Sequence, residues 1–244
     1  MKCPILMYHY IGEPIDPEDA PYFVSEKKFE EQMRFIHKRG FHSLNLEELM
    51  DGLYEGGELP KNSIVITFDD GHLSFFEKAA PVLKKYGLKA TLFVITDRIG
   101  QPNFMNWDQI KSVGHQGVSI ESHSVTHRIL AQLELDEVEM ELVESKSTLE
   151  KHLGREVDFF CYRGGHYNDA IKSMVSSSGY NAAVCSRFGY NDPQANRFEL
   201  RRIPVRGGDD IDIFGAKVHG MNWQSYGGKF LAKYWVPVKN ALFG

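Results

Sequence analysis

Residues 63–71 read Ser-Ile-Val-Ile-Thr-Phe-Asp-Asp-Gly, an apolar run that ends in two adjacent carboxylates. The run is typical of a buried strand. Two neighbouring carboxylates at the mouth of such a strand repel each other and cost desolvation energy. A fold tolerates Asp69 and Asp70 in this position only if a positive group lies beside them. The stretch therefore predicts a strand end that carries a charged functional site.

A second apolar run supplies groups that can hold the positive charge. Residues 118–120 are followed by His123 and His127, two imidazoles four residues apart. One carboxylate and two imidazoles that converge from two strand ends make a three-ligand metal site with open positions. We predict Asp70, His123 and His127 as the ligands, and Asp69 as a general base beside them. This set of residues is the skeleton of a metal-dependent hydrolase.

Length and composition are those of one globular domain. The 244 residues are 42% hydrophobic and 25% charged, and the net charge of −5 does not point to nucleic acid as a partner. The chain has three cysteines without CxxC spacing, Cys3, Cys161 and Cys185. We expect them to be buried free thiols. Because the start of the chain is also a poor signal peptide, a cytoplasmic location is expected.

Short apolar runs alternate with longer amphipathic ones along the chain. The predicted strands are 4–9, 63–69, 90–95, 117–122, 158–163, 181–186 and 200–205. The predicted helices are 25–39, 46–55, 73–86, 106–114, 134–153 and 168–178. This alternation predicts an α/β fold with a parallel sheet, and the length favours closure into a barrel. The candidate site residues then gather at the carboxyl ends of strands, where barrel enzymes carry their chemistry. They are His9, Asp69, Asp70, His123 and Arg163.

Two motifs carry a family resemblance. Residues 67–71, Thr-Phe-Asp-Asp-Gly, and residues 123–127, His-Ser-Val-Thr-His, resemble the first two motifs of the polysaccharide deacetylases, carbohydrate esterase family four. The segments 4–9, 80–87 and 200–205 are similar to the branch that includes bacterial poly-N-acetylglucosamine deacetylases. The resemblance implies a deformed (β/α)7 barrel, TIM-barrel-like, with the NodB-homology fold. It also implies removal of an N-acetyl group from an amino sugar.

The resemblance assigns roles to single residues. It makes Asp69 the base, makes Asp70, His123 and His127 the metal ligands, and makes His9 a candidate acid. One divalent ion is implied; zinc is the expected ion, with nickel, cobalt and iron as alternatives.

The third motif departs from the family pattern. The family has an aromatic–Pro–Tyr–Gly turn, often with an arginine just ahead of it. Here residues 159–168 read Phe-Phe-Cys-Tyr-Arg-Gly-Gly-His-Tyr-Asn, with Arg163 in the proline position and Gly164 in the tyrosine position. Cys161 falls where the upstream arginine would be. The Gly164 amide can still donate a hydrogen bond to an oxyanion.

Two arginines are candidates for orienting Asp69. Arg163 either does so or binds an anionic group of the substrate, and we count it among the catalytic residues. Arg202 is the other candidate for this orienting role. The residues predicted to contact the substrate are Gly164, Gly165, His166 and Arg202.

The expected substrate is an N-acetylated amino sugar in a glycan or a glycan precursor, including nucleotide- or lipid-linked forms. We divide the chain into a catalytic domain over 1–220 and an aromatic, basic tail over 221–244. The tail either contacts a membrane surface or packs against the barrel or a second subunit, so an oligomer is also considered.

Three alternative functions remain open at this point. An O-acetyl esterase or another amide hydrolase could use the same scaffold, and a catalytically altered relative could bind carbohydrate without cleaving it. Two histidines and one carboxylate are also the facial triad of non-haem iron oxygenases.

Overall fold

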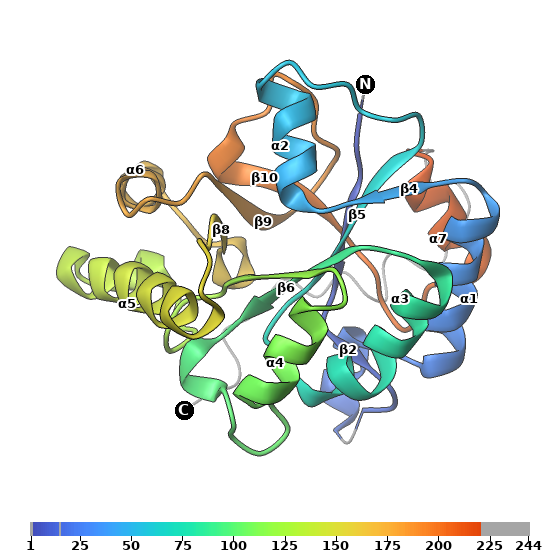
Figure 1. Cartoon of the computed structure of the whole chain (residues 1–244), viewed down its shortest axis with the longest axis horizontal. Coiled ribbons are helices and arrows are strands. Elements are labelled where there is room, and N and C mark those ends of the chain that lie inside the picture. Colours follow the sequence, from blue (N-terminus) through green and yellow to red (C-terminus); the bar gives the residue numbers. More distant parts are fainter. Residues whose placement is uncertain (1, 15, 221–244) are drawn as a thin grey trace.

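A computed structural model describes residues 2–14 and 16–220. Within these residues, seven parallel strands close into a barrel surrounded by helices (Figure 1). The barrel strands are β1 (Ile5–Tyr8), β5 (Ser63–Phe68), β6 (Ala90–Val94), β7 (Val118–Ser122), β8 (Phe159–Cys161), β9 (Ala182–Phe188) and β10 (Leu200–Pro204). They neighbour one another in the order β1-β10-β9-β8-β7-β6-β5, and β1 pairs with β5 to close the ring. The prediction of a (β/α)7 barrel is confirmed, and all seven predicted strands are present.

Three further short strands were not predicted. β4 (His42–Leu44) pairs with the first half of β5 outside the ring, and β2 (Tyr10–Ile11) pairs with β3 (Phe23–Val24) in a separate small sheet. Each has only two or three residues, which is too short to produce a periodic apolar signal.

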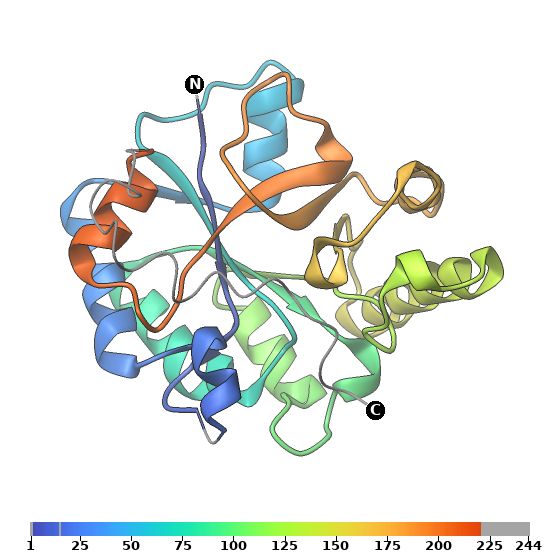
Figure 2. The ribbon, with the colours of Figure 1, turned by 180° about the vertical axis from the view of Figure 1, so that it is seen from behind.

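Helices cover the outside of the barrel. The six predicted ones appear as α1 (Glu26–Lys38), α2 (Leu46–Tyr54), α3 (Ala80–Tyr86), α4 (Trp107–Gly114), α5 (Leu135–Leu153) and α6 (Asp169–Ser177). A π-helical turn over Phe75–Ala79 precedes α3, and the unpredicted α7 (Ile211–Val218) follows β10. Figures 1 and 2 show α1, α3 and α7 on one side of the barrel and α5 and α6 on the other. Within the described residues, no helix has the length and apolar character to cross a membrane.

Side-chain alternation along the strands divides the core into two clusters. One cluster combines inward-facing residues such as Ile5, Val65 and Val184 with the apolar side of α2, which closes one end of the barrel (Figure 1). The larger cluster lies between the outer faces of the strands and the helices. Because successive strand residues face opposite sides, Thr67 and Asp69 point the same way as Val65. The alternation of side chains along β5 therefore directs Asp69 into the barrel.

The cysteines are free and buried, as predicted. The predicted tail, 221–244, lies outside the described residues, and the division of the chain at 220 stays a prediction.

Candidate active site

The three predicted metal ligands converge at the ends of β5 and β7. Asp70 Oδ1 lies 3.5 Å from His123 Nε2 and 3.5 Å from His127 Nε2. Asp70 and His123 are buried, whereas the His127 side chain is 24% exposed. These three residues are one of the groups whose ligand atoms all lie within 4.8 Å of one another. The arrangement leaves one side of the cluster open to solvent.

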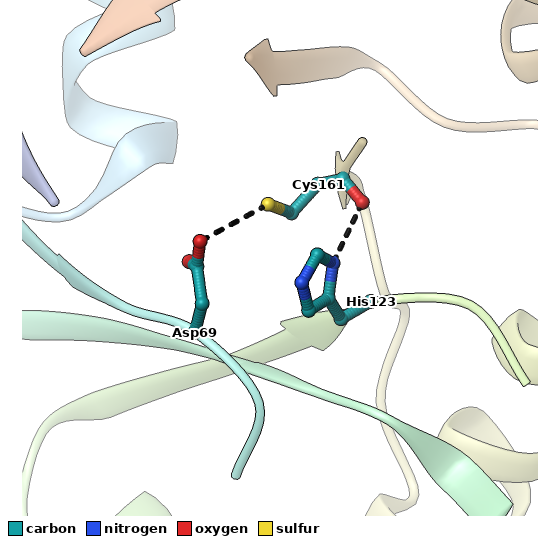
Figure 3. A group of neighbouring side chains, drawn as sticks. All are labelled: Asp69, His123 and Cys161. Carbon is teal, nitrogen blue, oxygen red and sulfur yellow. Dashed lines mark hydrogen bonds between the residues drawn. The ribbon is translucent and has the colours of Figure 1, made fainter. Parts of the chain in front are cut away.

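The spacing of the three atoms fits a divalent ion. Ligands at zinc distances in a tetrahedral site lie about 3.4 Å from one another. The observed 3.5 Å separations match this value and exceed an ordinary hydrogen bond. The His123 ring is also fixed from behind, because its Nδ1 lies 2.8 Å from the Cys161 carbonyl oxygen (Figure 3). A hydrogen bond at Nδ1 leaves Nε2 free to coordinate a metal.

The two histidines differ in their preferred charge. Burial and the neighbouring His123 lower the pKa of His127 to about 3, so its imidazole is neutral near pH 7. Burial also lowers the pKa of His123, but Cys161 and the Asp70 carboxylate outweigh burial and raise that pKa well above its usual value. The site therefore favours a positive charge at His123 Nε2, where a cation competes with a proton.

Backbone strain concentrates at the same residues. Asp70, Ser124 and His127 all have positive φ values, of 78°, 67° and 63°. Such backbone conformations are unfavourable for residues other than glycine, and they persist where the surrounding structure enforces them. In this site the strained positions include two of the three predicted ligands.

Asp69 is held by Arg202 from β10. Two parallel hydrogen bonds of 2.7 Å join Arg202 Nη1 and Nη2 to the two carboxylate oxygens. Burial raises the pKa of Asp69, but the charge and hydrogen bonds of Arg202 outweigh it and lower that pKa below its usual value. Asp69 is therefore an ionised carboxylate with a fixed orientation.

Arg202 lies inside the barrel, and its predicted contact with a substrate stays a prediction. Its side chain is completely buried, and it also donates to the Thr67 hydroxyl and the Cys185 carbonyl oxygen. Of the two candidate arginines it is Arg202 that is hydrogen-bonded to Asp69, whereas the Arg163 side chain makes no hydrogen bond or ion pair with another described residue; the Arg163 carbonyl oxygen accepts one from the His166 amide. Arg163 lies near enough to His127 for its charge to lower the pKa of that histidine. A direct role for Arg163 in catalysis stays a prediction.

Cys161 lies between Asp69, the predicted base, and His123, a predicted ligand. Its sulfur is 3.6 Å from Asp69 Oδ2 (Figure 3). The same sulfur is 3.2 Å from Arg202 Nη2. Asp69, His123 and Cys161 form a second group of potential metal ligands. This group fits an ion less well, since Arg202 occupies both oxygens of Asp69 and burial raises the pKa of the Cys161 thiol.

The remaining predicted residues follow β1 and β8. His9 Nε2 is 3.9 Å from Asp69 Oδ2, and the His9 side chain is 20% exposed. The turn Arg163–Gly165 follows β8 and places Gly164 in a left-handed conformation, with φ of 59°. A Cβ on Gly165 would lie 2.7 Å from the Ser186 backbone nitrogen, so this position has no room for a side chain. His166 is exposed, and its contact with substrate stays a prediction, as does that of Gly164 and Gly165.

Two residues that were not predicted hold the predicted ligands in place. The Tyr10 hydroxyl donates a 2.6 Å hydrogen bond to Asp70 Oδ2, which leaves Oδ1 facing the histidines. The buried Glu141 on α5 accepts hydrogen bonds from the Val125 and Thr126 amides, at 2.8 and 2.9 Å, and from the Thr126 hydroxyl. The sequence held a signal for Glu141, because it lies on the helix face that buries Val138, Leu142 and Ser145. Nothing in the sequence marked Tyr10.

Comparisons with known proteins agree with this geometry. The family model for polysaccharide deacetylase matches residues 56–183. A Bacillus subtilis protein assigned to the polysaccharide deacetylases, YxkH, is 31% identical over 220 residues, which cover 90% of this chain and 77% of YxkH. A poly-beta-1,6-N-acetyl-D-glucosamine N-deacetylase of Staphylococcus aureus is 28% identical over 202 residues, which cover 75% of this chain and 68% of that enzyme.

A solved structure gives the same result. The Streptococcus pyogenes deacetylase PplD, in complex with acetate, superimposes with a TM-score of 0.81 and is 30% identical. The match covers 85% of this chain and 94% of PplD. The chain belongs to the polysaccharide deacetylase family.

Proposed function

We propose that this protein is a metal-dependent de-N-acetylase, which hydrolyses the acetamide of an N-acetylated amino sugar to acetate and a free amine. The observation that carries the proposal is the pairing of two sites at one barrel rim. Asp70, His123 and His127 form a cluster with the spacing of metal ligands, and Asp69 lies beside it as an oriented, ionised carboxylate. Amide hydrolysis needs both an electrophilic centre and a base.

Each group in the site has a separate role in hydrolysis of the amide. A divalent ion held by Asp70, His123 and His127 would polarise the acetyl carbonyl and lower the pKa of water. Asp69 takes the proton from the attacking water, with Arg202 keeping its carboxylate ionised and aimed. The Gly164 amide donates a hydrogen bond to the oxyanion that develops on the carbonyl oxygen.

His9 delivers a proton to the leaving nitrogen. Burial lowers the pKa of His9 and outweighs the opposite effect of Asp69 and Asp70, so the ring is neutral near pH 7. A neutral imidazole can take up the proton collected by Asp69, 3.9 Å away, and pass it on. A low pKa makes the protonated ring a strong acid towards the amine.

The substrate class follows from the relatives. We propose a polymer or oligomer of N-acetylglucosamine, such as the β-1,6-linked glycan named for the Staphylococcus aureus enzyme. Zinc is the ion we propose, because one carboxylate and two imidazoles suit it. Nucleotide- or lipid-linked precursors are further proposed substrates. For the protein itself we propose a cytoplasmic location, contact of the tail 221–244 with a membrane, and assembly into an oligomer.

The decisive experiment measures acetate release by the purified protein. The panel contains oligomers of β-1,6-linked and β-1,4-linked N-acetylglucosamine, nucleotide-linked and lipid-linked N-acetyl sugars, and O-acetylated sugars. We expect release of acetate and free amine from an N-acetylated member, loss of this activity with a chelator, and recovery with zinc. Release from O-acetyl esters alone would replace the proposal with the esterase alternative.

A further inference from the structure

Tyr22 is an exposed aromatic ring at the opening of the site. The exposed large apolar side chains among the described residues are Tyr22, Leu135, Met140, Val143 and Phe188. Tyr22 is 44% exposed, and its ring centroid lies 5.1 Å from that of His9 at an interplanar angle of 63°. His9 in turn lies 3.9 Å from Asp69. A ring that contacts the predicted acid and also faces solvent is placed to touch a bound substrate.

The segment that carries this ring is a short helix with a capped first turn and two prolines. Tyr22 ends the 3-10 helix Pro17–Tyr22, whose first turn is capped by an Asp16 side chain that accepts a hydrogen bond from the Glu18 amide at 3.0 Å. Pro17 and Pro21 restrict the backbone of this helix. A rigid support lowers the entropy lost when a ligand binds.

The residue after Tyr22 anchors the segment to the barrel. Phe23 pairs with Tyr10 between β3 and β2, and its ring packs 4.9 Å from the Tyr10 ring. A Cβ on Gly207 would lie 2.4 Å from the Phe23 carbonyl oxygen, so the chain after β10 lies directly against this backbone. Tyr22 is therefore held at a fixed place relative to Asp69 and Asp70.

Within residues 2–14 and 16–220, the groups next to Tyr22 at the rim have less exposed apolar surface. The Tyr10 hydroxyl is bonded to Asp70, and its ring lies between Phe23 and His72 at centroid distances of 4.9 and 4.7 Å. The turn Arg163–Gly165 after β8 contributes a charged arginine and two glycines, which have no side chains. A sugar ring in this site would thus find its apolar support on the Tyr22 side of the opening.

We propose that Tyr22 is a specificity-determining residue, on which a pyranose ring of the glycan stacks while its acetamide, or that of the adjacent sugar, lies at Asp69. This inference rests on the proposed function. The C–H groups on one face of a pyranose are apolar, and an aromatic ring can cover them while the sugar hydroxyls stay in water. A small acetyl ester has no sugar ring, so it gains no binding energy from this stacking contact.

The test compares two substrates in Tyr22→Ala and Tyr22→Phe. The substrates are the pentamer of β-1,6-linked N-acetylglucosamine and 4-nitrophenyl acetate. We expect Tyr22→Ala to lower kcat/KM for the pentamer by about tenfold, mainly through KM, because a stacked ring contributes modest binding energy. Hydrolysis of 4-nitrophenyl acetate should stay within twofold of wild type. Tyr22→Phe keeps the ring and should retain most of the pentamer activity.

A matched control removes exposed apolar surface elsewhere. Val143 on α5 is 45% exposed, and Val143→Ala should leave both substrates unaffected. Equal losses on both substrates in Tyr22→Ala, or unchanged activity on the pentamer, would overturn the inference. Acetate release from the pentamer by the wild type tests the proposed function, whereas the ratio between variants tests Tyr22, so the two can fail separately.

Discussion

Arg202 donates two hydrogen bonds of 2.7 Å to Asp69, one to each carboxylate oxygen, inside a closed parallel barrel. Both side chains are buried, so each charge would be costly without the other. The bidentate geometry also fixes the plane of the carboxylate. Because Arg202 approaches from β10, Asp69 does not need an arginine at position 161, where a cysteine stands. The predicted base and the cation that orients it thus come from two strands far apart in the sequence.

Replacing Arg202 with lysine should reduce activity strongly. A lysine keeps the charge but cannot form two parallel hydrogen bonds to one carboxylate. We expect kcat to fall by about 10- to 100-fold, with zinc content unchanged. The measurements are acetate release and metal analysis of the purified variant. Arg201→Lys is the matched control, because Arg201 is exposed on the same strand. Equal activity of the two variants would contradict the orienting role.

Asp69 and Asp70 should respond differently to substitution. Asp69→Asn removes the base but no predicted ligand, so activity should be lost while the protein still binds one zinc ion. Asp70→Ala removes a ligand and should lose the metal together with the activity. Metal analysis after dialysis distinguishes the two outcomes, and circular dichroism checks that both variants fold. Retained activity in Asp69→Asn would exclude Asp69 as the base.

Glu141→Gln should weaken metal binding from outside the ligand set. The glutamate accepts hydrogen bonds from two amides of the segment that joins His123 and His127. A glutamine keeps the shape but replaces one acceptor oxygen with a donor. Loss of such outer partners typically costs about 10- to 100-fold in metal affinity. The zinc dissociation constant is measured by competition with a chromogenic chelator.

The control for this experiment is Glu144→Gln, which removes a charge from an exposed position of the same helix. The Glu144→Gln variant should bind zinc as the wild type does. A zinc affinity of Glu141→Gln equal to that of this control would show that the buried carboxylate supports only the fold.

The Asp69–Arg202 pair should make stability depend on pH in acid. Burial raises the pKa of Asp69, but Arg202 lowers it below its usual value, so unfolding must raise it. The stabilisation is complete above the unfolded pKa of about 4 and is lost as the pH falls through the lower folded value. In metal-free protein, the difference in unfolding free energy between wild type and Asp69→Asn should therefore shrink between pH 5 and pH 2. The size of this decrease is set by the difference between the folded and unfolded pKa of Asp69. Urea unfolding at a series of pH values measures it, and a constant difference would refute the coupling.

Local features of the sequence determined much of the protein. The seven apolar runs became the seven barrel strands, because a buried parallel strand needs nearly continuous apolar residues. Charged and imidazole side chains directly after β5 and β7 could be placed at one rim, because parallel strands bring their carboxyl ends together. Asp70, His123 and His127 were predictable as neighbours for this reason.

Only the tertiary structure decided which distant side chains complete the site. Asp69 and Arg202 are 133 residues apart, and Arg163 was an equal candidate from the sequence. Arg202 can reach Asp69 because the barrel closes through β1, which pairs with both β5 and β10. Alternate residues of β10 face the same side, so Arg202 points into the barrel as Leu200 does. Tyr10, Tyr22 and Glu141 also lie near the candidate site residues only through contacts between different segments. Strand pairing, register and helix docking are properties of contacts between segments, and no local pattern encodes them.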